Sequence, residues 1–91
     1  MIARVAVWDP MPDDDRDWVL EAVAGLPGVH GAYHLVDPAT GKGLSIAFFE
    51  DETAAAAARE AISERAKAIG WHDVPHPAPT SETIYQVMRH T

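Results

Sequence analysis

The middle of the chain contains two alternating apolar segments joined by a short glycine-containing turn, and this feature constrains the fold more than any other. The two segments are VHGAYHLV (29–36) and LSIAFFE (44–50). Between them lies DPATGKG (37–43), where Pro38 suits the first corner of a turn and the glycines allow positive φ. Because alternation with a period of two is typical of strands, the sequence predicts an antiparallel hairpin here.

One predicted strand and one predicted helix precede this hairpin. The segment IARVAVW (2–8) alternates, and the proline-containing run 9–12 ends it. Asp13 to Asp15 are predicted to supply an N-cap and first-turn negative charge for a helix. Its apolar residues recur at helical spacing through Leu26, and the pair Pro27-Gly28 ends it.

A second helix and a fourth strand follow the hairpin. Asp51 is the predicted N-cap of an alanine-rich helix that ends at Gly70, and TIYQVMRH (83–90) is the predicted last strand. The order is βαββαβ. We therefore expect one α+β domain over residues 1–91, a ferredoxin-like sandwich in which a four-stranded antiparallel sheet carries both helices on one face.

The strands carry apolar residues on both faces, including the face of the sheet that the helices do not cover. Ile46 and Phe48 lie on one face of the third strand, and Ala47 and Phe49 on the other. A sheet with one solvated face alternates more cleanly with polar residues. The pattern predicts that a second copy of the chain covers this face, so we expect a homodimer.

Composition excludes several classes of function. The net charge is −7 and the seven basic residues are scattered, which argues against nucleic acid or an anionic membrane as the partner. The absence of cysteine excludes thiolate catalysis and zinc–thiolate sites. No signal peptide and no apolar run of about 18 residues is present, so we expect a soluble cytoplasmic protein.

The run from Leu26 to Ala58 resembles a known group of proteins. Its marks are Pro27-Gly28 before a strand, Gly31 within that strand, the DP-x-TGKG turn, and Phe49-Glu50 before an alanine-rich helix. These are similar to the antibiotic biosynthesis monooxygenase-like superfamily of dimeric α/β-barrel proteins. The resemblance implies two sheets packed back to back and a pocket in each subunit between helices and sheet. It also implies cofactor-independent oxidation or haem degradation as activities, and the complete lack of Asn disfavours haem degradation.

The candidate site residues belong to the segment GWHDVPHPAPTSE (70–82) and to the second strand. His72 and His76 are the predicted catalytic groups, because imidazoles exchange protons near neutral pH. Trp71, His34 and Tyr33 are the predicted substrate-binding residues, since an indole stacks on a planar ring and a phenol hydroxyl orients one. The alternative is that Trp71 only packs beneath a surface loop while both histidines face water.

The remaining titratable residues predict no metal site and no cofactor. His30 and His34 are expected on one strand face, with rings roughly 13 Å apart, too far to share an ion. Asp13, Asp14, Asp15 and Asp17 match no calcium-loop spacing and are interpreted as helix-capping and solubilising groups. Arg4 and Arg89 are expected to pair with carboxylates such as Asp9 or Glu82, and the alternative is that they bind an anionic ligand.

The sequence is compatible with three functions. The first is cofactor-independent oxidation of a small aromatic or polyketide-like compound. The second is a non-catalytic ligand-binding or stress-response dimer, and the third, disfavoured, is a haem-handling protein. The expected partners are a second copy of the chain and, where the pocket is used, a small aromatic ligand.

Overall fold

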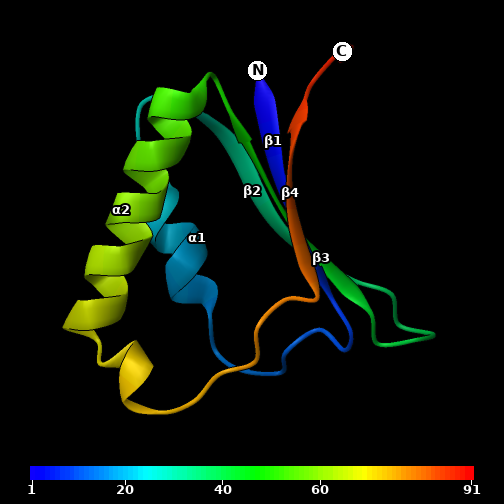
Figure 1. Cartoon of the computed structure of the whole chain (residues 1–91), viewed down its shortest axis with the longest axis vertical. Coiled ribbons are helices and arrows are strands. Elements are labelled where there is room, and N and C mark those ends of the chain that lie inside the picture. Colours follow the sequence, from blue (N-terminus) through cyan, green and yellow to red (C-terminus); the bar gives the residue numbers. More distant parts are fainter.

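A computed structural model describes all residues, 1–91, and shows the predicted order of elements (Figure 1). The strands are β1 (Ile2–Trp8), β2 (Val29–Val36), β3 (Gly43–Phe49) and β4 (Ser81–Gln86). The helices are α1 (Asp17–Val23), α2 (Glu52–Ala68) and the one-turn 3-10 helix η1 (Trp71–Asp73).

The four strands form one antiparallel sheet in the order β2-β3-β1-β4, and α1 and α2 lie together on one of its faces (Figure 1). Arg4 on β1 pairs with Ala47 of β3 on one side and with Ile84 of β4 on the other. These pairs define the register across the centre of the sheet. This is the predicted ferredoxin-like α+β arrangement. Neither α1 nor α2 combines the length and the hydrophobicity that a membrane-spanning helix needs.

Helix α2 begins and ends as the sequence predicts. The Asp51 side chain accepts a hydrogen bond from the backbone N–H of Ala54 at 2.9 Å. At the other end, Gly70 has φ +71°, the left-handed conformation that glycine adopts without a steric penalty. Its alanines allow a close approach to the sheet, and Ala58 is 1% exposed in a core cluster with Val23 and Phe49.

Helix α1 is shorter than predicted, and its acidic leader does not cap it. The helix begins at Asp17, its N-cap position is Arg16, and no side chain caps it. The prediction that Asp13 to Asp15 form the cap and first turn is therefore wrong. The physical reason is that Asp14 has a stronger partner than a backbone amide, namely the Arg16 guanidinium.

The strands depart from the prediction in two details. A β-bulge between Val29 and Gly31 leaves His30 without a partner on β3, so the alternation that places His30 and His34 on one face is interrupted between them. The last strand, predicted at 83–90, runs from Ser81 to Gln86 instead. Thr80 precedes it and bonds the carbonyl of Val7 through both its amide and its hydroxyl, which starts the pairing early.

Candidate functional site

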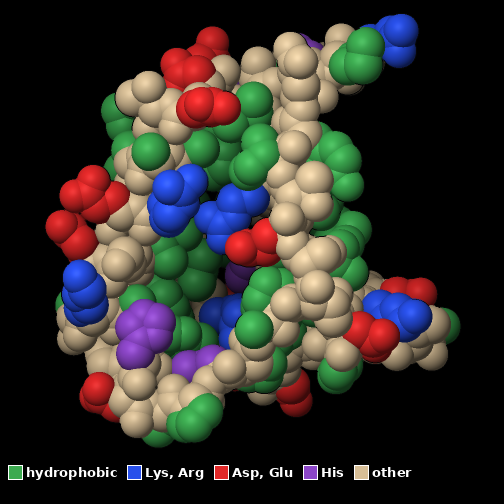
Figure 2. All heavy atoms as spheres, viewed as in Figure 1, with side chains coloured by type: hydrophobic (Ala, Val, Ile, Leu, Met, Phe, Trp, Pro, Cys, Tyr) green, Lys and Arg blue, Asp and Glu red, His purple; other side chains and the backbone are tan.

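A hollow lies between the helices and the sheet and is visible as an opening in the molecular surface (Figure 2). Its outer part is a cavity of about 440 Å³, which is within the usual size range of small-molecule pockets. A smaller apolar space of about 60 Å³ lies deeper and shares Ala6, Val19, His34 and Ser45 with it. Three indoles (Trp8, Trp18 and Trp71, here called the tryptophan cluster) line the outer cavity.

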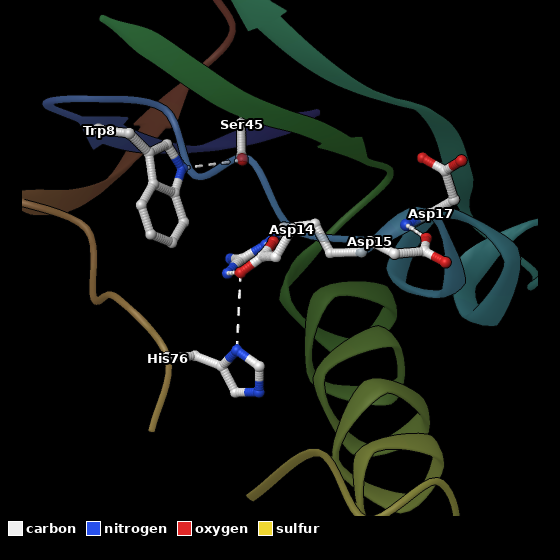
Figure 3. Close-up of polar contacts among 7 residues, drawn as sticks. Trp8, Asp14, Asp15, Asp17, Ser45 and His76 are labelled. Atoms are coloured by element: carbon white, nitrogen blue, oxygen red, sulfur yellow. Dashed lines mark hydrogen bonds and ion pairs between the residues drawn. The ribbon is translucent and has the colours of Figure 1, made fainter. Parts of the chain in front are cut away.

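The pairing register of β1, β3 and β2 determines which sheet side chains point into this site. Ala6, Ser45 and His34 are consecutive partners across β1, β3 and β2, so all three project from the helix-covered face. Two residues along β1, Trp8 projects from the same face. Its Nε1 donates a hydrogen bond to Ser45 Oγ at 3.0 Å (Figure 3). This bond fixes the buried Trp8 ring as one wall of the cavity.

Arg16 lies between two members of the tryptophan cluster. Its guanidinium carbon is 4.8 Å from the centre of the Trp8 ring and 5.3 Å from that of Trp71, both within cation–π range. The same guanidinium donates two hydrogen bonds to Asp14, from Nε at 2.6 Å and from a terminal nitrogen at 2.7 Å. These bonds hold the pKa of Asp14 below its ordinary value, against the opposing effect of burial.

His76 packs against one member of the tryptophan cluster, Trp71. Its ring stacks on Trp71 with centroids 3.5 Å apart and an angle of 1° between the planes. Its Nδ1 is 3.6 Å from a carboxylate oxygen of Asp14, and the two side chains face each other in Figure 3. Trp71 also meets Trp18 edge-on at 5.2 Å. The loops 9–16 and 70–80 are therefore fastened together at this end of the hollow.

Two buried nitrogens in this region have no hydrogen-bond partner: Trp18 Nε1 and His76 Nε2. A buried polar atom without a partner costs about 1–3 kcal/mol relative to a paired one. Both rings contact Trp71. The wall around Trp71 thus has unused hydrogen-bonding capacity, which is common at functional sites.

His34 is the imidazole that reaches furthest into the hollow, since it lines both the outer cavity and the deeper space. Burial lowers its pKa below the ordinary value of 6.5, and the positive charge of Arg16 lowers it further, while Asp17 acts in the opposite direction. His34 is therefore neutral at pH 7 and available as a proton acceptor.

The structure brings together some of the predicted site residues and separates others. Trp71, His72 and His34 line the outer cavity, with His72 exposed at its mouth. His76 lies behind Trp71 and is not among the residues that line it. Tyr33 borders the deeper space, but its ring lies over Gly31 and meets Phe48 edge-on, on the sheet face away from the helices.

Several residues of the site were not predicted from the sequence. Asp14 and Arg16 looked like ordinary surface charges because their partners Trp71 and His76 lie more than fifty residues away in the chain. Trp18 was assigned to the helix pattern and Trp8 to the strand pattern. The available signal was that three tryptophans are unusual in 91 residues, and all three meet at one place.

No group of three or more His, Asp or Glu side chains lies close enough together to hold a metal ion. Nor do the residues present fit haem as a resident cofactor. An axial imidazole is normally oriented by a hydrogen bond from its second ring nitrogen. Neither His34 nor His72, the two histidines that line the outer cavity, makes a side-chain hydrogen bond.

Comparison with known proteins supports the fold. No protein-family model matches the chain, and no curated protein matches its sequence. Among solved structures, Rv0793 from Mycobacterium tuberculosis is similar over 98% of this chain and 96% of its own, with a TM-score of 0.70 and 12% identity. A protein from Chloroflexus aurantiacus J-10-fl, assigned as an antibiotic biosynthesis monooxygenase, is similar over 99% and 96%, with a TM-score of 0.63 and 13% identity.

A third similar structure is the haem degrader MhuD (Rv3592) from Mycobacterium tuberculosis with two haems in its active site. It matches over 99% of this chain and 97% of its own, with a TM-score of 0.57 and 19% identity. The chain therefore shares its fold with these solved structures, one of which carries the antibiotic biosynthesis monooxygenase assignment that the resemblance in its sequence pointed to. At sequence identities this low, the similarity supports a shared architecture only. The chemistry has to be argued from the residues of the site.

Proposed function

We propose that this chain binds a small planar aromatic compound in the outer cavity and oxidises it with molecular oxygen, without a cofactor. The observation that carries the proposal is the pairing of a cavity walled by the tryptophan cluster with a neutral imidazole, His34, inside it. Indole faces bind a flat ring, and a neutral imidazole accepts a proton from it.

The chemistry needs only a base and a protected space. Removal of a proton from a hydroquinone or from a carbon acid such as anthrone gives an electron-rich anion, which transfers electrons to oxygen. With anthrone, one O₂ is consumed, one of its oxygen atoms becomes the new quinone carbonyl, and the other leaves as water. His34 accepts the proton, His72 exchanges protons with solvent at the mouth, and His76 holds Trp71 in place.

Oxygen consumption with anthrone as substrate tests this proposal. We expect His34→Ala to lower the rate by roughly 10²–10⁴-fold, the usual contribution of a general base. His30→Ala is the matched control, because His30 lies on the same strand, is exposed, and pairs with Glu50 outside the cavity. Equal rates in the two variants contradict the assignment of His34. Binding of anthrone without any oxygen uptake supports the alternative, a non-catalytic ligand-binding dimer.

We also propose that the active species is a homodimer. The sheet face away from the helices exposes Tyr33 (52%), Leu35 (46%) and Tyr85 (54%), beside the partly buried Ile46 and Phe48. An apolar face of this kind is the surface that a second sheet covers in a dimeric α/β barrel.

A further inference from the structure

The mouth of the outer cavity is positively charged, although the molecule as a whole is acidic. The chain has 14 acidic and 7 basic residues. Three of its five arginines, Arg4, Arg16 and Arg59, nevertheless line this cavity, and Glu82 is the single acidic residue that does so. Figure 2 shows basic side chains grouped around the opening of the hollow, with apolar side chains inside it.

The three guanidinium groups differ in whether they have a partner. Arg16 is held by Asp14 through two hydrogen bonds, and Arg4 is held by Glu82 at 3.0 Å. Arg59 makes no ion pair and no hydrogen bond to another side chain. One positive charge at the mouth is therefore uncompensated, and it belongs to Arg59.

The surroundings of Arg59 form a recess and not a flat surface. A hollow of about 260 Å³ is lined by Arg4, Arg59, Glu82, Thr83 and Ile84, so the two guanidinium groups face a common space. Ser63 lies one helical turn after Arg59 and lines the outer cavity beside it. Two arginines and a hydroxyl thus supply donors at the mouth, and the tryptophan cluster lies further in.

We propose, on the basis of the function proposed above, that the ligand of this cavity is a planar aromatic monocarboxylate whose carboxylate binds Arg59 at the mouth. Guanidinium groups match carboxylates with two parallel hydrogen bonds. The unpaired Arg59 guanidinium balances one negative charge. The Glu82 carboxylate beside it repels the second negative charge of a dianion such as a phosphate monoester. The aromatic rings then extend inward to the tryptophan cluster and His34.

Isothermal titration calorimetry with 2-naphthoate and its neutral analogue 2-naphthamide tests this assignment, because the two probes differ mainly in charge. We expect wild-type protein to bind 2-naphthoate about tenfold more tightly than 2-naphthamide, as one charged hydrogen-bonded pair provides. In Arg59→Gln this ratio falls to about one, while the affinity for 2-naphthamide stays unchanged. Arg65→Gln is the matched control on the same helix, since Arg65 pairs with Glu21 and does not line the cavity.

Each outcome of this titration has a definite meaning. Equal binding of both probes to wild-type protein, or an unchanged ratio in Arg59→Gln, overturns the carboxylate assignment and leaves the aromatic cavity standing. If neither probe binds, the carboxylate assignment and the proposed ligand cavity fail together. Arg59 is exposed, so its replacement is not expected to impair folding, and thermal unfolding of each variant checks this.

Discussion

At the scale of single residues, His34 is the group whose environment most clearly differs from water. Its neighbours on the sheet are Ser45 and Ala6, and both burial and the Arg16 charge disfavour its protonated form. A histidine whose pKa is lowered on folding binds protons less readily in the folded protein than in the unfolded chain. Stability then increases with pH across the interval between the two pKa values.

This gives a pH prediction for His34. Its contribution to stability is complete above pH 6.5 and is lost as the pH falls from 6.5 through the lower pKa of the folded state. Urea unfolding at pH 8, 6 and 5 measures the effect, and NMR titration of the imidazole signals measures the pKa directly. We expect His34→Gln to reduce the loss of stability on acidification. A His34 pKa at or above 6.5 contradicts this prediction.

At the scale of elements, the sequence was sufficient where local pattern decides the structure. The hairpin, the Asp51 cap, the glycine after α2 and the Arg4–Glu82 pair all follow from nearby residues or from strand order. Prediction failed where a distant partner competes. Asp14 was assigned to a helix cap, but Arg16, stacked between Trp8 and Trp71, takes its carboxylate. The bulge in β2 gave no signal in the alternation, and it leaves His30 without a partner on β3.

The segment 70–82 shows how element and site are related. It joins α2 to β4, and its 3-10 turn directs Trp71 inward while His72 remains exposed. His76 then contacts Trp71 and Asp14, which fastens the loop to the beginning of α1. The segment is therefore both a connection between α2 and β4 and a wall of the cavity. Trp71 forms the wall, and the stacked His76 ring holds Trp71 in place.

Gly28, in the connection between α1 and β2, carries an element-scale prediction with an internal control. Gly25 and Gly28 both have φ +78°, but a Cβ at Gly25 meets nothing within 4 Å, whereas a Cβ at Gly28 lies 2.7 Å from that of Ala54 on α2. Gly25→Ala should cost about 1–2 kcal/mol of unfolding free energy from backbone strain alone. Gly28→Ala should cost a further ~1–3 kcal/mol from overpacking. Urea unfolding of both variants measures the difference, and equal costs would show that α2 moves away freely.

At the scale of the whole molecule, the sheet has two apolar faces and only one of them is covered. Only ten residues are buried, so the covered face supplies a small core for a chain of this length. The helix-covered face holds the cavity, and the open face holds Tyr33, Leu35 and Tyr85. In the proposed dimer, association through the open face would add buried apolar area without closing the cavity, so the proposed ligand and the second copy would use separate surfaces.

The oligomeric state gives the last prediction. Light scattering on the eluting peak should report about twice the chain mass of 9.9 kDa at micromolar concentration. Leu35→Arg places a charge in the middle of the apolar face and should give monomers, because an unpaired charge in a buried interface costs several kcal/mol. Val74→Arg is the control, since Val74 is similarly exposed but belongs to the loop 70–80, outside the sheet. A wild-type mass near 10 kDa, or monomers from both variants alike, contradicts association through this face.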